Sequence, residues 1–159
     1  MSFDPREFRN ALGRFATGVC VITANPEGEK PFGMTVNSFA SVSLEPPLVL
    51  WSLQKNSECA PAFEKATQFT VNILAADQQS VSNQYAKKGA HDLLEGSYRQ
   101  GRSGCVVLKD VMTSFECDID ARHDGGDHII LVGRVLELNN HPAEREPLLF
   151  FSGKYRELK

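Results

Sequence analysis

The sequence lacks the features that mark nucleic-acid-binding, membrane and secreted proteins. Its 17 lysines and arginines are scattered and the net charge is −3, so neither nucleic acid nor an anionic membrane surface is expected as a partner. No apolar stretch approaches the roughly 20 residues that span a bilayer. Residues 1–7 contain no apolar core of a secretory signal, so we expect a cytoplasmic protein.

The cysteines form no pattern typical of a metal site. Cys20, Cys59, Cys105 and Cys117 lie far apart, and none belongs to a CxxC pair. We therefore expect no metal site and four reduced thiols, most of them buried. Cys105 follows Ser103-Gly104 in a predicted loop, where its thiol could be exposed. Nothing near it in the sequence would activate it as a nucleophile.

Motifs of hydrolytic and nucleotide-binding enzymes are also missing. The chain contains no Gly-x-Ser-x-Gly, no His-Glu-x-x-His, no P-loop and no Rossmann glycine motif. His91, His123 and His141 lie in predicted turns or loops, where a solvated histidine is ordinary. His128 differs because it begins a strand directly after a tight turn, at the rim of any barrel, although a structural role is ordinary there too.

Three helices are predicted. The first begins at Asp4-Pro5, an N-cap followed by proline, and its apolar residues Phe8, Leu12 and Phe15 form one face that we expect to pack on the core. The second follows Ser57, a candidate N-cap, and runs to Lys65. The third opens at residues 77–79 and ends at residues 87–89.

Short β-rich segments make up most of the remaining chain. They are residues 19–24, the stretch that begins at 33, and residues 48–53, 69–74, 106–108, 114–121, 128–138 and 147–151. Asp124-Gly125-Gly126-Asp127 predicts a hairpin turn, and Gly133 a bend or bulge. Residues 90–104 are expected to form a long loop with a short helical piece. Because helices serve only as caps or crossovers, we predict one mainly β domain over residues 1–159, a barrel with added helices.

Residues 33–47 carry small polar side chains, among them Thr35, Asn37 and Ser38, and end at a double proline. Such a segment suits a polar, phosphate-bearing ligand that is held and not chemically attacked. The alternative is a strand with a solvated Ser/Thr face. Since the chain has few acid–base groups in recognisable motifs, hydride transfer between two organic cofactors would fit, because the cofactors then carry the chemistry.

Seven segments, in order along the chain, resemble the short-chain flavin reductases, the reductase components of two-component flavin-dependent monooxygenases. They are residues 9–19, 33–39, 41–48, 69–74, 126–128, 132–135 and 147–155. The resemblance implies an FMN-binding split β-barrel and an enzyme that transfers hydride from NADH or NADPH to FMN or FAD. It also implies a homodimer and a partner monooxygenase that uses the reduced flavin. The rival interpretation is a non-catalytic flavin- or haem-binding split-barrel carrier or sensor.

The same resemblance assigns candidate site residues. Those implied for the flavin are Met34, Thr35, Val36, Asn37, Ser38, Trp51, Ser52, Leu53, Ser57, Tyr85 and Lys88. His128 would position the nicotinamide, with Tyr155 nearby. Two segments depart from the family pattern: residues 104–108 lack a proline that such reductases often carry, and residues 90–102 show no family signature. Dinucleotide preference and the identity of the partner therefore stay open.

Overall fold

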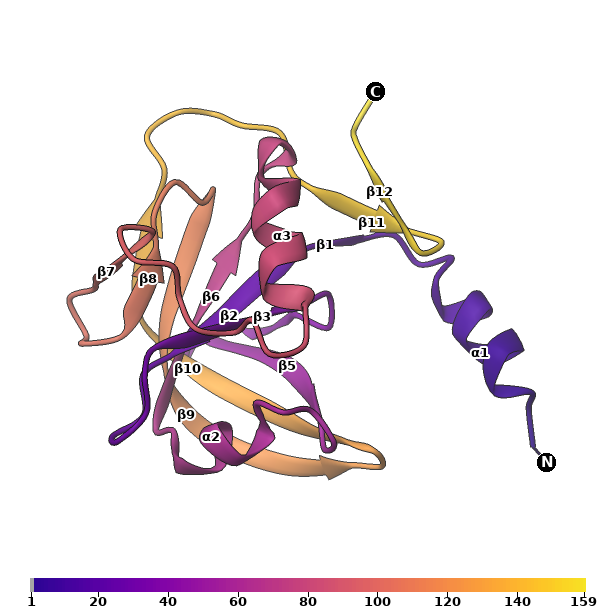
Figure 1. Ribbon diagram of the computed structural model, residues 1–159, viewed down its shortest axis with the longest axis horizontal. Helices are drawn as coiled ribbons and strands as arrows, with labels where there is room; N and C mark the ends of the chain where they lie inside the picture. The colour runs from indigo at the N-terminus through magenta and orange to yellow at the C-terminus, as the bar shows by residue number, and fades with distance from the viewer. Residues whose placement is uncertain (1) are drawn as a thin grey trace.

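A computed structural model describes residues 2–159 as a curved antiparallel sheet with helices and a small hairpin packed around it (Figure 1). The seven strands of the sheet follow the order β3 (Phe32–Val36), β2 (Cys20–Ala24), β6 (Gln68–Ile73), β9 (Thr113–Gly125), β10 (His128–Asn140), β5 (Leu48–Gln54) and β4 (Ala40–Ser43). No ladder joins the edge strands β3 and β4 within the described residues. The sheet is thus not closed, and the predicted mainly β split barrel is confirmed.

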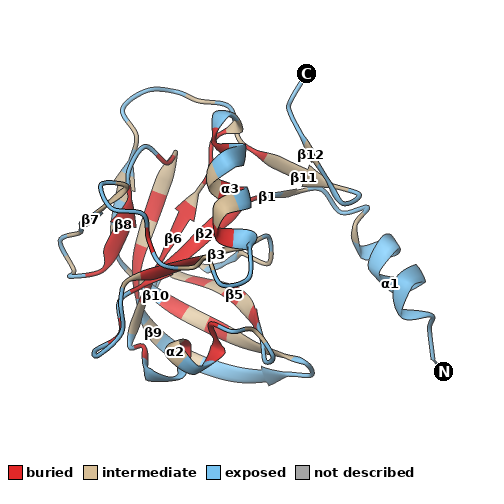
Figure 2. Ribbon diagram, in the orientation of Figure 1, coloured by how far each residue is buried: buried red, intermediate tan, exposed pale blue. Residues whose placement is uncertain are grey.

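Two hydrophobic cores lie on opposite faces of β2. Cys20 and Ile22 point into the barrel, where they join Trp51 and Phe69, whereas Val19 and Val21 point to a second core outside it. The second core is closed by α3 (Gln79–Ala86) and β8 (Val106–Leu108). Because both of its faces are covered, β2 is buried over its whole length, as the abundance of β-branched residues in 19–24 predicts. Figure 2 shows this continuous burial.

The alternating pattern of residues 69–74 predicts a half-buried strand, and this prediction is wrong for β6. Thr70 and Asn72 are fully buried. The Asn72 amide donates to the Val21 carbonyl at 2.9 Å and to the Thr23 hydroxyl at 3.0 Å, while its oxygen accepts the Leu108 amide at 3.0 Å. The polar face of the strand therefore holds β8 onto the barrel instead of facing water.

The segment 90–104 contains no helix in the structure, contrary to the prediction. It is a loop followed by β7 (Tyr98–Gln100), which pairs with β8 in a separate hairpin. Glu116 of β9 lies beneath this hairpin and is fully buried. Its carboxylate accepts hydrogen bonds from the Ser103 amide at 3.1 Å, from the Ser103 hydroxyl, and from the Asn139 amide at 2.9 Å. These hydrogen bonds compensate the buried charge of the carboxylate and join the hairpin to the sheet.

The predicted hairpin at residues 124–127 is confirmed. Gly125 pairs with His128 across a two-residue turn in which Gly126 has φ +78°, a conformation that favours glycine. The ladder shifts register between Val132 and Gly133, where a bulge was predicted. A Cβ atom on Gly133 would lie 2.5 Å from the Phe69 ring of β6 and 2.9 Å from the Cys117 Cβ of β9, so glycine leaves the space that the Phe69 ring occupies in the core.

The N-terminal helix α1 (Pro5–Leu12) begins as predicted, since the Asp4 carboxylate accepts the Arg6 amide at 2.9 Å. The prediction that it packs on the core is wrong. None of its residues is buried, and it stands apart from the barrel in Figures 1 and 2. Its spacing of apolar residues indicated a face but not what covers that face. The Gly13 carbonyl at its end accepts the Ser152 amide at 2.8 Å.

The remaining elements border the sheet. The strand β1 (Thr17–Gly18) pairs with β11 (Leu149–Phe151), which pairs in turn with β12 (Lys154–Arg156). The short helix α2 (Ala60–Lys65) and the 3-10 turn η1 (Ala76–Gln78) precede β6 and α3 respectively. None of the helices in residues 2–159 is both long and apolar enough to cross a membrane.

All four cysteines are free and buried, as predicted for reduced thiols. Burial raises the pKa of Cys20 to about 12 and, with the charge of Glu58, that of Cys59 to about 11. The expectation that the Cys105 thiol could be exposed is wrong, because the β7–β8 hairpin folds it inward to 5% exposure. Burial raises its pKa as well, so it is a poor nucleophile.

Candidate functional site

A polar hollow of about 410 Å³ opens beside the edge strand β3. It lies between the end of β3, the end of β5, the turn that follows β5 and the end of α3. Its lining residues are Met34, Thr35, Gln54, Asn56, Ser57, Glu58, Tyr85, Ala86, Lys88 and His91. Its volume lies in the range of small-molecule sites, and it brings together five of the candidate flavin residues: Met34, Thr35, Ser57, Tyr85 and Lys88.

The hydroxyl groups of Thr35 and Tyr85 form hydrogen bonds that join the segments lining the hollow. The Thr35 hydroxyl donates to the Ser82 carbonyl at 2.6 Å, which joins β3 to α3. The Tyr85 hydroxyl accepts the Leu94 amide at 3.1 Å, which joins α3 to the following loop. Tyr85 is also almost fully buried, at 2% exposure. Both side chains therefore shape the hollow. The Thr35 hydroxyl hydrogen and one lone pair of the Tyr85 hydroxyl are already hydrogen-bonded within the protein.

The open polar groups of the hollow are Gln54, Asn56, Ser57 and Lys88. Among the residues that the structure describes, no carboxylate forms an ion pair with Lys88. Neutral amides, a hydroxyl and one ammonium group suit a ribityl chain and a phosphate. Ser57 is not the N-cap of α2: it lies in the turn before the helix, and its hydroxyl accepts the Cys59 amide at 3.2 Å.

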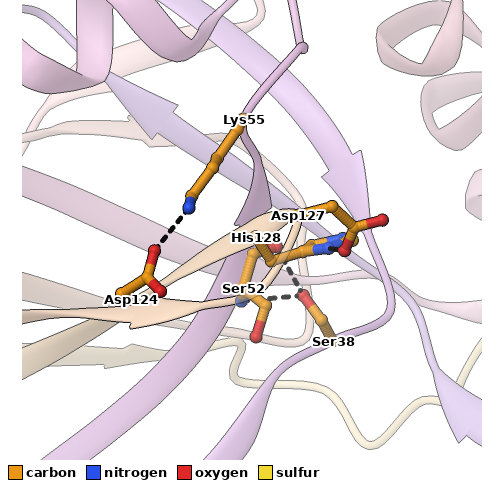
Figure 3. A network of polar contacts seen from close by, with 6 residues as sticks. All are labelled: Ser38, Ser52, Lys55, Asp124, Asp127 and His128. Atoms are coloured by element: carbon orange, nitrogen blue, oxygen red, sulfur yellow. Dashed lines mark hydrogen bonds and ion pairs between the residues drawn. The ribbon is translucent and has the colours of Figure 1, made fainter.

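Asn37 and Ser38 line a second, larger hollow of about 820 Å³ between α1 and the Phe150–Gly153 segment. The Ser38 hydroxyl reaches across to β5, where it accepts the Ser52 amide at 3.0 Å and donates to the Ser52 carbonyl at 3.1 Å (Figure 3). Ser38 and Ser52 are thus brought together, as partners of each other. Val36 is partly buried against the barrel core.

Trp51 and Leu53 point into the barrel and away from the hollow. Trp51 is fully buried, with its ring centroid 4.9 Å from that of Phe63 and 5.8 Å from that of Phe69. Leu53 is 2% exposed in the same core. Residues alternate between the faces of β5, so Ser52 and Gln54 take the outer face. Any contact of Trp51 or Leu53 with a bound flavin would therefore involve the main chain.

His128 does not line the hollow. It stands next to the hollow, at its rim, because it pairs with the lining residue Gln54 in the β10–β5 ladder. Its Nδ1 is 2.7 Å from the Asp127 carboxylate, and this hydrogen bond is the main cause that lowers the pKa of Asp127. The Lys55 amide donates to the Asp127 carbonyl at 2.9 Å, and Lys55 forms an ion pair with Asp124 (Figure 3). These contacts fix the turn that carries the imidazole.

Tyr155 contacts α3 and not the turn that carries His128. Its hydroxyl is 2.6 Å from the Ser82 hydroxyl and donates to the Asn83 side chain at 3.2 Å. Ser82 therefore links Tyr155 to Thr35 on β3. No described contact joins Tyr155 to His128.

Several lining residues were missed by sequence reasoning: Gln54, Asn56, Glu58, Ala86 and His91. His91 was assigned to a solvated loop, yet its ring bridges Gly33 and Glu58. A single sequence carries no signal for this bridge, because its members lie on three segments far apart in the chain. The resemblance supplied no help, since residues 90–102 carry no family signature.

Comparisons with known proteins define the class. Residues 12–159 match the flavin reductase like domain family, and the chain belongs to that family. It is 49% identical to the "FMN reductase (NADH) SmoA" of Agrobacterium fabrum over 96% of this chain and 85% of the relative. It is 39% identical to "Flavin-dependent monooxygenase, reductase subunit HsaB" of Rhodococcus jostii, over 97% of this chain and 78% of the relative.

A solved structure agrees. The Streptomyces globisporus NADH:FAD oxidoreductase SgcE6, in complex with NAD and FAD fragments, is 33% identical and superimposes with a TM-score of 0.89. The match covers 100% of this chain and 97% of that one. The predicted family and fold are confirmed by these comparisons.

Proposed function

We propose that the protein is an NAD(P)H:flavin oxidoreductase that binds FMN or FAD in the hollow beside β3 and supplies reduced flavin to a partner monooxygenase. The observation that carries this proposal is the composition of the hollow. It offers neutral donors and one unpaired ammonium, and His128 stands at its rim. The names of the relatives, an NADH-dependent FMN reductase and a monooxygenase reductase subunit, support the same function.

The side chains of this protein would bind the flavin and the nicotinamide and orient them toward each other. A bound flavin would supply the hydride acceptor and a nicotinamide the hydride donor, so no side chain would need to gain or lose a proton. Lys88, Ser57 and Asn56 would hold the phosphate and ribityl groups. His128, fixed through Asp127, would position the nicotinamide and keep the two ligands at a reacting distance.

The proposal is tested by measuring NADH and NADPH oxidation with FMN, FAD and riboflavin added in turn. We expect oxidation that depends on added flavin, from protein that is colourless or weakly coloured after gel filtration. A yellow protein that retains its flavin and oxidises neither nucleotide would support the rival, a non-catalytic carrier or sensor. Absence of oxidation with all three flavins would contradict the proposed activity.

We also propose that the protein is a homodimer in which α1 packs against a second copy. Phe3, Phe8, Leu12 and Phe15 are 52% to 79% exposed. An isolated helix of eight residues is unstable in water, so α1 needs packing that its own barrel does not give. A second copy would cover this face and bury the wall of the 820 Å³ hollow that α1 lines.

Light scattering on a size-exclusion column checks this dimer. Native protein is expected to elute with twice the mass of one chain at micromolar concentration, and the double variant Phe8→Ser/Leu12→Ser as a monomer. The matched control is Arg6→Ser on the polar part of the same helix, which should leave the dimer intact. A native monomer, or a dimer unchanged by the double variant, would contradict the proposed interface.

Two further predictions accompany this function. We propose a cytoplasmic location, which the four free, buried thiols support because oxidising compartments favour disulfides. We also propose that residues 1–159 act as one domain, supported by the two cores that share the strand β2.

A further inference from the structure

The hollow of about 820 Å³ between α1 and residues 150–153, the α1 hollow, is lined by two cations that binding of a flavin beside β3 does not use. These cations are Arg9 and Arg14, and the lining contains no acidic residue. Arg14 also borders a smaller hollow with Asp4 and Glu7, but neither arginine forms an ion pair within the described part of the chain. The α1 hollow therefore carries two positive charges in a chain whose net charge is −3.

The α1 hollow adjoins the candidate flavin hollow through one short stretch of chain. Met34 and Thr35 of β3 line the flavin hollow, and Asn37 and Ser38, just after the end of the same strand, line the α1 hollow. A ligand in one hollow would therefore meet a ligand in the other across residues 34–38.

The same stretch lies near the ring that would position the nicotinamide. The Ser38 hydroxyl bonds both main-chain groups of Ser52 on β5 (Figure 3). Two residues further along β5, Gln54 pairs with His128. Two residues of a strand span about 7 Å, so Ser38 and His128 stand at levels of the sheet about 7 Å apart. A nicotinamide beside His128 would have the α1 hollow within reach of the rest of its dinucleotide.

The lining of the α1 hollow has the chemistry of a nucleotide site. A guanidinium group is charged at every working pH and binds phosphate oxygens through paired hydrogen bonds. Two of them, on Arg9 and Arg14, match the two negative charges of a pyrophosphate. Leu12, Phe15 and Phe150 add apolar and aromatic surface to the same lining, which suits a flat base such as adenine.

The second copy proposed above would increase the need for a negative ligand. It would bury the wall of the α1 hollow and draw both arginines away from water. Removing a charge from water is costly unless an opposite charge compensates it, and this chain provides no carboxylate in the lining. A bound pyrophosphate would supply the compensating charge.

We propose that Arg9 and Arg14 bind the pyrophosphate of NADH or NADPH and that the α1 hollow holds the adenosine half of the dinucleotide. This inference rests on the proposed function, since it assumes that a nicotinamide stands at His128. The flavin phosphate is assigned to Lys88 in the other hollow, so the two phosphorylated ligands use separate cations.

Steady-state kinetics at saturating FMN tests the proposal. We expect the double variant Arg9→Gln/Arg14→Gln to raise KM for NADH about tenfold, with kcat and the FMN dissociation constant within about twofold of the native values. ADP-ribose, which carries the pyrophosphate and adenosine without the nicotinamide, should compete with NADH, and its inhibition constant should rise by the same factor. Arg9→Lys/Arg14→Lys should regain part of the lost affinity, because the charges return without the paired geometry.

Two controls isolate the contact with phosphate. A dihydronicotinamide that carries a benzyl group in place of the ribose and phosphates should reduce FMN equally well with the native protein and the double variant. Arg6→Gln, on the same helix but outside the lining of the α1 hollow, should leave KM for NADH unchanged. Light scattering should give the double variant the same mass as the native protein.

The outcomes separate this inference from the proposed function. Native protein that oxidises neither nucleotide with any flavin would overturn both. Native protein that oxidises NADH, with KM unchanged in the double variant or rates lowered equally for the benzyl donor, would leave the function standing and overturn the inference. A double variant that loses its partner copy would also overturn it, because the arginines would then bind a second chain. Weakened FAD binding with NADH kinetics unchanged would place the adenosine of the flavin there and contradict the assignment to NADH.

Discussion

His128→Ala is expected to lower kcat/KM for NADH by about a hundredfold while the dissociation constant of the flavin stays within about twofold of the native value. The imidazole stands at the rim of the hollow, fixed by Asp127 and by the β10–β5 ladder. Misplacing a bound reactant by about 1 Å can cost a factor of 100 in rate, and removal of the side chain would free the nicotinamide to move by that much. Stopped-flow absorbance of flavin reduction measures the rate, and fluorescence quenching measures flavin binding.

The matched control for this variant is His141→Ala, in which another strand-flanking histidine is removed at the opposite end of β10. It should leave both constants unchanged. A large loss of flavin affinity in His128→Ala would refute the assignment to the nicotinamide. A rate unchanged by the substitution would do so equally, because the site would then position the hydride donor without this ring.

Glu116→Gln is expected to lower the free energy of unfolding by about 3 kcal/mol at pH 7. Glu116 is fully buried and accepts three hydrogen bonds, and hydrogen bonds to a charged group contribute about 1.5–3 kcal/mol each. Glutamine has nearly the same shape, but its NH₂ group would face a donor. Urea denaturation followed by far-UV circular dichroism measures the change. Asp118→Asn, two residues along β9 and exposed, should cost less than about 0.5 kcal/mol.

The same carboxylate gives a pH dependence of known sign. Burial alone would raise the pKa of Glu116, but hydrogen bonds from Asn139 and Ser103 and the charge of Arg99 outweigh it and lower the pKa below its ordinary value of 4.5. The stabilisation is therefore fully present above about pH 4.5 and is lost as the pH falls through the lower, folded-state pKa. Unfolding measured from pH 7 to pH 3 should show a loss of stability that is smaller in Glu116→Gln.

The parts of the fold that follow local patterns were predicted well. The β9–β10 turn, the bulge at Gly133 and the N-cap Asp4 all depend on residues that are neighbours in sequence or fixed by backbone geometry. The family and its fold were predicted from ordered motifs and are confirmed. Predictions that needed knowledge of what lies opposite a segment were wrong. The apolar face of α1 has no cover, and the polar face of β6 has one.

Predictions for the candidate site divide in the same way, between local patterns and contacts of distant segments. Met34, Thr35, Ser57, Tyr85 and Lys88 meet in one hollow, as a flavin site would need, although their roles stay predictions. The alternation of β5 turns Trp51 inward, which a list of motif residues does not reveal. Glu58 and His91 were missed because a carboxylate and an imidazole 33 positions apart give no local pattern. Only the folded chain places them against each other.

The hydroxyl group of Thr35 has a consequence for how quickly a ligand can come and go. By donating to the Ser82 carbonyl, it sets the separation of β3 and α3, two walls of the candidate flavin hollow, before any ligand arrives. A pocket whose walls already stand at their final separation needs no rearrangement to fill, and none to empty. Residence of the flavin would then be governed by its own contacts, so that a cofactor altered by reaction can be released to another enzyme on the timescale of turnover.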